Sequence, residues 1–252
     1  MRKIQLVLVA LIVLILSAFK ADHVITIYMI GDSTMSNKPL EGNNQERGWG
    51  HVLGSFFTED VRVENHAMNG RSSKSFIDEG RWETVVNKIR PGDYVFIQFG
   101  HNDEKPQPER HTDPGTTFDE NLRKFVRETR AKGGIPVLFN SIVRRNFGVN
   151  PDAVAADDIR PEKDEAVVEG DTLIDTHGKY LESPRNVAKE MDVCFIDLNQ
   201  ATKKLVESYG VEGSKKLFMW IPADTYAACP KGRQDNTHLN IYGARKVAAL
   251  AG

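Results

Sequence analysis

The sequence has few cysteines, no excess of charge of either sign and almost no long apolar runs. Its 252 residues include two cysteines and no Cys-x-x-Cys pair, which argues against a structural zinc site. With 33 Lys and Arg against 35 Asp and Glu, the formal net charge is −2, so we expect no nucleic-acid partner. No Gly-x-Ser-x-Gly and no Gly-x-x-x-x-Gly-Lys-Ser/Thr segment occurs, which excludes the nucleophile elbow and the phosphate-binding loop. The length suits one large α/β domain or two small ones.

The one long apolar run lies at the N-terminus, where Met1-Arg2-Lys3 precedes residues 5–16 and then Ser17-Ala18. A basic start, an apolar stretch and small residues are the layout of a secretory signal peptide. We therefore expect a signal peptide over residues 1–21 and a mature domain over residues 22–252, secreted or periplasmic, with no stable membrane association after cleavage. The run is short for a membrane span, which needs roughly 20 residues, and an uncleaved anchor is the alternative.

Strand-like runs alternate with helical patterns along the rest of the chain. The strand-like runs are residues 23–30, 61–65, 93–99, 136–142 and 193–198. The helical patterns are residues 49–57, 81–89, a stretch from 117 that ends at Gly133-Gly134, and residues 181–191, 201–209 and 242–250. This order predicts one doubly wound α/β domain with a central parallel sheet and helices on both faces. Residues 145–171 interrupt the pattern, and we expect a surface insertion there, either a solvated loop or a border of the substrate cleft.

Polar clusters follow the first three predicted strands, and a fourth lies near the C-terminus. They are Gly31-Asp32-Ser33, Asn69-Gly70-Arg71, Gly100-His101-Asn102-Asp103 and Asp235-Asn236-Thr237-His238. Ligands of such sheets bind outside the carboxyl ends of the strands. We therefore expect all four clusters to meet at one edge of the sheet.

Together these clusters contain the parts that acyl transfer needs. Ser33 offers a hydroxyl, which becomes a nucleophile only when a base takes its proton. His238 is the candidate base, and Asp235 is a carboxylate that would fix its tautomer. The backbone N–H of Gly70 and the amide of Asn102 are candidate donors to an oxyanion. Each cluster alone is more typical of a turn or a helix cap, and only their joint occurrence favours catalysis.

The amino-acid sequences of these clusters closely resemble those of one family. The segments "GDSTM", "NHAMNGRSSKSF", "QFGHND" and "DNTHLNIYGA" are similar to those of the SGNH (GDSL-type) hydrolases, and within them to the rhamnogalacturonan acetylesterase branch, carbohydrate-esterase family twelve. The resemblance covers roughly residues 23–250. It implies a flavodoxin-like, three-layer αβα fold with a five-stranded parallel sheet. It also implies a serine esterase that removes acetyl groups from plant cell-wall pectin and needs no metal or organic cofactor.

The resemblance also implies a role for each matching residue. Ser33 would be the nucleophile, His238 the base and Asp235 its partner. The N–H groups of Ser33 and Gly70 and the amide of Asn102 would form the oxyanion hole. The chain departs from the branch in a long 152–171 stretch and in a short last helix, which ends at Gly252.

Three further residues are candidates for substrate binding. Arg71 could pair with the carboxylate of a galacturonate, although a surface arginine is equally consistent with its position. His101 could line the cleft or be a packed histidine, and Trp220 could stack on a sugar ring or belong to the core. We expect Asp32 to hold the turn through hydrogen bonds to nearby backbone, outside the catalytic machinery.

Other interpretations stay open at this stage. The polymer could be acetylated xylan or the substrate another acyl ester, and the scaffold could be a carbohydrate-binding protein without activity. A metal could be held by His101, Asp103, Asp235 and His238, although metal-ligand histidines usually come in tighter sets. Cys194 and Cys229 could pair, or Cys194 could be a free buried thiol.

Overall fold

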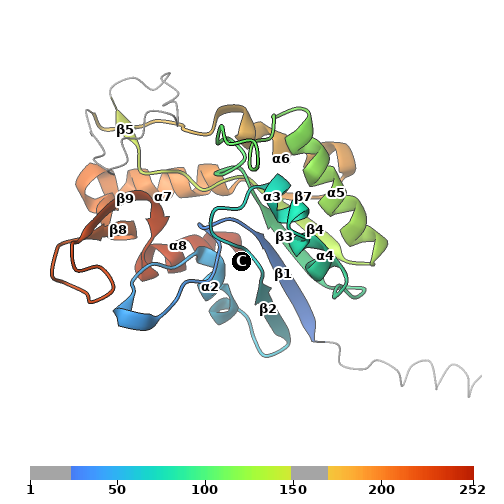
Figure 1. Cartoon of the computed structure of the whole chain (residues 1–252), viewed down its shortest axis with the longest axis horizontal. Helices are drawn as coiled ribbons and strands as arrows, with labels where there is room; N and C mark the ends of the chain where they lie inside the picture. Colours follow the sequence, from blue (N-terminus) through green and yellow to red (C-terminus); the bar gives the residue numbers. More distant parts are fainter. Residues whose placement is uncertain (1–23, 149–169) are drawn as a thin grey trace, which may run out of the picture.

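A five-stranded parallel sheet forms the centre of the molecule (Figure 1). The computed structural model describes residues 24–148 and 170–252. The strands are β1 (Ile25–Gly31), β2 (Val61–Asn65), β3 (Tyr94–Gln98), β4 (Ile135–Phe139) and β7 (Cys194–Ile196), in the order β2-β1-β3-β4-β7. The predicted parallel sheet of five strands is confirmed, and each predicted strand overlaps an observed one.

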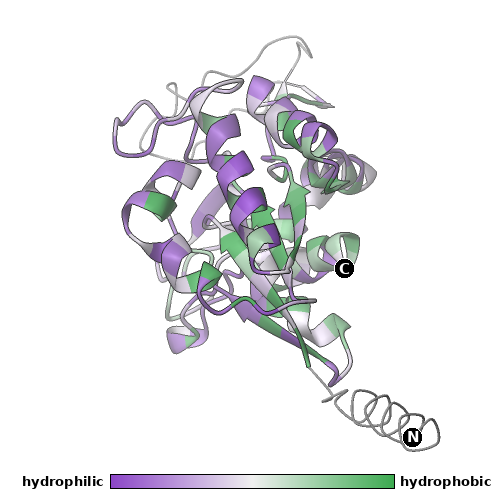
Figure 2. Cartoon of the chain, turned by 90° about the vertical axis from the view of Figure 1, so that its right-hand side faces the viewer, coloured by the Kyte–Doolittle hydropathy of each residue, from purple (hydrophilic) through white to green (hydrophobic). Residues whose placement is uncertain are grey.

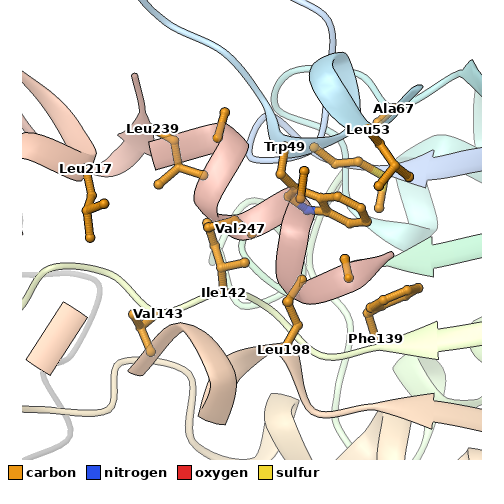
Figure 3. Close-up of a cluster of buried hydrophobic side chains, with 14 of the residues drawn as sticks. Trp49, Leu53, Ala67, Phe139, Ile142, Val143, Leu198, Leu217, Leu239 and Val247 are labelled. Atoms are coloured by element: carbon orange, nitrogen blue, oxygen red, sulfur yellow. The ribbon is translucent and has the colours of Figure 1, made fainter. Parts of the chain in front are cut away.

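The strands are apolar because both faces of the sheet are covered. Side chains alternate between the faces along each strand, so Met29 belongs to one buried cluster and Ile30 to the other. Figure 2 shows hydrophobic residues concentrated along the central strands and hydrophilic residues on the outer surfaces of the helices. Figure 3 shows part of one cluster, in which Trp49 and Phe139 lie with their ring centroids 5.6 Å apart.

Helices cover the two faces and give the three layers of the predicted αβα sandwich. One face carries α2 (Trp49–Val52), α7 (Leu198–Gly213) and α8 (Ile241–Ala251), whose apolar side chains join the cluster of Met29. The other face carries α3 (Ser73–Asp78), α4 (Arg81–Val86), α5 (Thr117–Ala131) and α6 (Glu182–Met191), whose side chains join the cluster of Ile30. Short 3-10 turns are η1 (Glu41–Asn43), η2 (Leu53–Phe56), η4 (Gly178–Leu181) and η5 (Ser214–Leu217).

Several elements differ from the sequence prediction. The hairpin β8 (Phe218–Ile221) and β9 (Arg233–Leu239) forms a separate antiparallel sheet, and Asp235 to His238 lie within β9. The helix α3 was also not predicted; it begins at Ser73, and the side chain of the preceding residue, Ser72, forms a capping box with Ser75. Two strands of two residues each, β5 (Phe147–Gly148) and β6 (Thr172–Leu173), pair in antiparallel fashion at the two ends of the predicted insertion.

Both cysteines are free, so the alternative in which Cys194 and Cys229 pair is wrong. In the other alternative Cys194 is a free buried thiol; it is free, but it is not buried. Cys194 is exposed because β7 is an edge strand of the sheet. The predicted signal peptide, residues 1–21, and most of the predicted insertion, residues 145–171, lie outside the described residues. Within residues 24–148 and 170–252, none of the helices combines the length and apolar character that crossing a bilayer requires.

Candidate active site

The turn after β1 carries Ser33 to the carboxyl-terminal edge of the sheet. Asp32 holds the turn: its Oδ1 accepts hydrogen bonds from the Thr34 N–H at 2.9 Å and the Thr34 hydroxyl at 2.8 Å. Gly31 is required here, because a Cβ at this position would lie 2.6 Å from the Gln98 carbonyl oxygen. The expected role of Asp32 in the turn is confirmed. Asp32 is fully buried, and burial raises the pKa of its carboxyl group.

The hairpin brings a histidine and a carboxylate to Ser33. His238 Nε2 lies 2.9 Å from Ser33 Oγ, and His238 Nδ1 lies 2.7 Å from Asp235 Oδ2. The other oxygen, Asp235 Oδ1, accepts the backbone N–H groups of Thr237 at 2.7 Å and His238 at 2.9 Å. Burial acts to raise the pKa of Asp235, but the hydrogen bonds and charges of His238 and Arg233 hold it well below its ordinary value. This geometry lets His238 accept the proton of the Ser33 hydroxyl.

Gly70 and Asn102, the predicted oxyanion donors, lie on two neighbouring loops. Gly70 has a φ of +73°, which favours glycine, and a Cβ built there would meet nothing within 4 Å. Asn102 Nδ2 donates to the Arg71 carbonyl at 3.2 Å, and Asn102 Oδ1 accepts from Arg110 Nη1 at 3.4 Å. An amide nitrogen has two N–H groups, and the bond to Arg71 uses one of them. Arg110 was missed at the sequence level, where nothing connects it to Asn102.

Asp103 fixes these two loops against each other. Its carboxylate accepts hydrogen bonds from the Ser73 N–H and hydroxyl, the Thr112 hydroxyl and the Gly100 N–H, at 2.5 to 3.1 Å. Ser73 begins α3, which follows the Gly70 turn, and Gly100 precedes Asn102. Burial raises the pKa of Asp103 to about 7, although the hydrogen bonds from Ser73 and Thr112 act in the opposite direction.

The three candidates for substrate binding lie in different surroundings. Arg71 Nε contacts Glu79 at 3.0 Å. His101 is 4% exposed and packs edge-on against His177, with ring centroids 4.5 Å apart. Trp220 donates to Asn236 Oδ1 at 2.9 Å. The roles of Arg71, His101 and Trp220 in substrate binding stay predictions.

A surface groove of about 450 Å³ lies beside the hairpin β8–β9. Its lining includes Trp220, Tyr226, Tyr242 and Arg245, and it does not include Ser33 or His238. The groove is therefore separate from the reacting atoms.

The four residues of the metal alternative are not gathered into a site. Asp235 and His238 bond to each other, whereas Asp103 faces Ser73 and Thr112. In the part of the chain that the structure describes, the group with metal-ligand spacing is His101, Glu104 and His177, whose candidate atoms lie within 4.8 Å of one another.

His101, Glu104 and His177 belong to a cluster of paired charged side chains. Glu104 forms an ion pair with the buried Arg144, whose guanidinium places a positive charge where a metal ion would add another. His177 Nδ1 lies 3.0 Å from Glu104 Oε2, and Nε2 lies 3.1 Å from the Ile142 carbonyl oxygen. The residues therefore fit a packed ion-pair cluster better than a metal centre.

The chain is similar in sequence and fold to known esterases. The chain is 40% identical to the rhamnogalacturonan acetylesterase RhgT of Bacillus subtilis over 226 residues, which cover 90% of this chain and 87% of RhgT. The crystal structure of YxiM from the same organism superposes with a TM-score of 0.67 at 28% identity, over 90% of this chain but 55% of YxiM, so the chain spans about half of that protein. An acetyl-xylooligosaccharide esterase of Geobacillus stearothermophilus, at 20% identity and a TM-score of 0.58 over 90% of this chain and 92% of its own, shares the fold.

The family model for the GDSL-like Lipase/Acylhydrolase family matches residues 29–246, from the end of β1 into α8. This span contains every residue of the predicted triad and oxyanion hole. The chain belongs to the GDSL-like lipase/acylhydrolase family.

Proposed function

We propose that this chain is an exported serine esterase that removes acetyl groups from plant cell-wall rhamnogalacturonan. The observation that carries the proposal is the continuous contact from Ser33 Oγ through His238 to Asp235, at 2.9 and 2.7 Å. The substrate class is supported by the name of RhgT, to which the chain is 40% identical over 90% of its length. Arg71, at the edge of this site, is a candidate partner for a uronate carboxylate.

The first half of the reaction would acetylate the enzyme. His238 Nε2 takes the proton of the Ser33 hydroxyl while Oγ attacks the carbonyl carbon of the acetyl ester. The carbonyl oxygen becomes an oxyanion, which would accept hydrogen bonds from the N–H groups of Ser33 and Gly70 and from the Asn102 amide. The tetrahedral centre then expels the sugar hydroxyl, which receives the proton held by His238 and leaves the acetyl group on Ser33 Oγ.

The second half would release acetate. A water molecule gives a proton to His238 Nε2 and attacks the acetyl carbonyl on Ser33. The new oxyanion uses the same donors, and its collapse returns the proton to Ser33 Oγ as acetate leaves. Asp235 stabilises the histidine cation in both halves and keeps Nδ1 protonated throughout.

Export is part of the proposal, and it is supported by residues 1–21, whose basic start and apolar run are typical of a signal peptide. Expression of the full chain followed by N-terminal sequencing of the protein outside the cytoplasm tests this. A new N-terminus near residue 22 is expected, whereas an intact N-terminus in the membrane fraction would contradict the proposal.

Acetate release from acetylated rhamnogalacturonan, measured beside acetylated xylan, tests the activity and the substrate together. We expect faster release from rhamnogalacturonan and none from either polymer with the Ser33→Ala variant, which loses the attacking oxygen but keeps the fold. Faster release from xylan would contradict the substrate. Unchanged p-nitrophenyl acetate hydrolysis by Ser33→Ala would contradict the chemistry, and sugar binding without turnover by the wild type would indicate a carbohydrate-binding protein.

A further inference from the structure

A row of alternating charges connects the base of the site with the Asn69–Arg71 turn, which carries Gly70. It begins at Asp235 and continues through Arg233, Glu46 and Lys38 to Asn69. The residues come from three segments that are distant in the sequence: β9, the loop between β1 and α2, and the turn after β2. None of Arg233, Glu46 and Lys38 touches Ser33, so the proposed mechanism gives them no step.

Arg233 forms the end of the row at the triad. One guanidinium nitrogen, Nη2, donates to Asp235 Oδ2, the same oxygen that receives His238 Nδ1, and lies 3.3 Å from that nitrogen. The other, Nη1, donates to Glu46 Oε2 at 2.5 Å. Arg233 therefore holds the carboxylate of Asp235 from the side opposite to the backbone N–H groups that bind Oδ1.

Lys38 forms the end of the row at the Asn69–Arg71 turn. Its ammonium group contacts Glu46 Oε1 at 2.8 Å and Asn69 Oδ1 at 2.5 Å, and its side chain is only 3% exposed. Ser36 Oγ donates to the same Asn69 oxygen at 2.6 Å. Asn69, the residue before Gly70, is therefore hydrogen-bonded to Ser36 and Lys38 in the segment that follows Ser33.

Glu46 lies between these two ends, on a segment whose backbone is hydrogen-bonded to its neighbours. Its backbone pairs with Asn240, and the Arg47 N–H donates to the Leu239 carbonyl at 3.0 Å, directly after His238. The Gly48 N–H donates to the Ser36 carbonyl at 3.2 Å, which ties the same segment to the nucleophile turn. The Lys38 and Glu46 side chains are 3% and 14% exposed, whereas that of Arg233 is 31% exposed. Burying charges is costly even when they are paired, so the Lys38–Glu46 pair at this place needs a reason other than stability.

We propose that Arg233 is a positioning residue that holds the Asp235–His238 pair in its reactive geometry. Through Glu46 and Lys38 it also fixes that pair relative to the Asn69–Arg71 turn, so that the base and the oxyanion donors keep their spacing. This inference rests on the proposed esterase function of the site. It concerns Arg233, Glu46 and Lys38, the charged residues of the row that take no step in the proposed reaction.

The test compares Arg233→Met, which keeps the apolar stem, with Arg233→Lys, which keeps a charge, and with Arg62→Met as a surface control. Arg62 pairs with Glu64 at 3.0 Å and its side chain is 68% exposed. With p-nitrophenyl acetate we expect Arg233→Met to lower kcat about 10- to 100-fold with KM nearly unchanged. Arg233→Lys, which keeps a cationic donor beside Asp235, should recover part of the lost kcat, and Arg62→Met should match the wild type in both constants.

The double variant of Arg233→Met with Lys38→Met tests the connection to the Asn69–Arg71 turn. If both residues act through one row, the double variant should lose little more than the stronger single variant. Multiplicative losses would overturn the connection. A kcat for Arg233→Met equal to that of Arg62→Met would overturn the positioning role, as would a rise in KM with kcat unchanged or a loss of kcat that lysine does not recover.

These outcomes are separable from failure of the proposed function. If the wild type shows no turnover that depends on Ser33, the esterase function fails. If the wild type is active and Arg233→Met behaves like Arg62→Met, only the positioning role fails. Should Arg233→Met not fold, kcat and KM of the Arg233→Lys variant relative to those of Arg62→Met decide the same question.

Discussion

Replacing Asn102 by alanine should slow the chemical step far more than it weakens substrate binding. The Asn102 amide nitrogen has two N–H groups, and its bond to the Arg71 carbonyl at 3.2 Å uses one of them. In the proposed reaction this donor acts on an oxyanion that exists only after attack by Ser33. Removing one such donor typically costs about 3 to 4 kcal/mol of transition-state stabilisation, which corresponds to a loss of about 100- to 1000-fold in kcat.

Arg110 offers a graded variant of the same experiment. Its Nη1 lies 3.4 Å from Asn102 Oδ1 and orients the amide without reaching the expected position of the oxyanion. The Arg110→Met variant keeps the donor but loses the bond that orients it. A long hydrogen bond of this kind contributes about 1 kcal/mol, so we expect a loss of roughly 5-fold in kcat.

Steady-state kinetics with p-nitrophenyl acetate measure kcat and KM for the wild type, Asn102→Ala and Arg110→Met. Urea unfolding checks the fold, because loss of the bond to Arg71 should cost Asn102→Ala only about 1 kcal/mol. The expected order of kcat is wild type, Arg110→Met, Asn102→Ala, with KM nearly constant. A kcat for Asn102→Ala within about threefold of the wild type, or a rise in KM alone, would refute the oxyanion role.

Two further predictions concern stability. The folded state holds the Asp103 proton to a pH of about 7, whereas the unfolded chain releases it near pH 4, so the free energy of unfolding should fall by about 2 to 3 kcal/mol between pH 5 and 8. Urea unfolding at both pH values should show this fall in the wild type and a smaller one in Asp103→Asn; equal falls would contradict the prediction. Gly243→Ala should destabilise the protein by about 3 kcal/mol, because the new Cβ would lie 1.9 Å from the Leu217 carbonyl oxygen. Gly213→Ala, where the nearest atom is 3.6 Å away, should stay within about 1 kcal/mol of the wild type, and similar midpoints for the two would contradict the argument.

The central sheet could be predicted because its strands are buried on both faces and their apolar runs end in turns. The same property located the site, since in a parallel sheet the segments after β1, β2 and β3 meet at one edge. The clusters that contain Gly31, Gly70 and Gly100 therefore identified three of the four parts of the site before any contact was known.

The hairpin β8–β9 could not be predicted in the same way. Strand β9 reads Arg-Gln-Asp-Asn-Thr-His-Leu, and its buried positions are Asp235, Thr237 and Leu239. Burial alternates along it, but polarity does not, because Asp235 and Thr237 are buried for hydrogen bonding. Once residues 233–239 are known to form a strand, Arg233 and Asp235 must share a face, because they are two residues apart. Pairings such as Arg110 with Asn102 depend on tertiary contact alone.

Three buried aspartates organise the site, and their ionisation differs in a way that suits the chemistry. Asp32 holds the nucleophile turn, Asp103 holds the two donor loops, and Asp235 holds His238. Burial raises the pKa of Asp32 and that of Asp103. The nearby carboxylate of Asp32 raises the pKa of Asp103 further. Asp235 bonds to both Arg233 and His238, and its pKa is lowered.

The lowered pKa of Asp235 keeps a negative charge on the carboxylate that stabilises the histidine cation. The raised pKa values of Asp32 and Asp103 favour their neutral forms, and a neutral carboxyl group adds no full negative charge to the site. Because like charges raise the energy of an oxyanion, the burial that raises these two pKa values acts in favour of the transition state that Gly70 and Asn102 would stabilise.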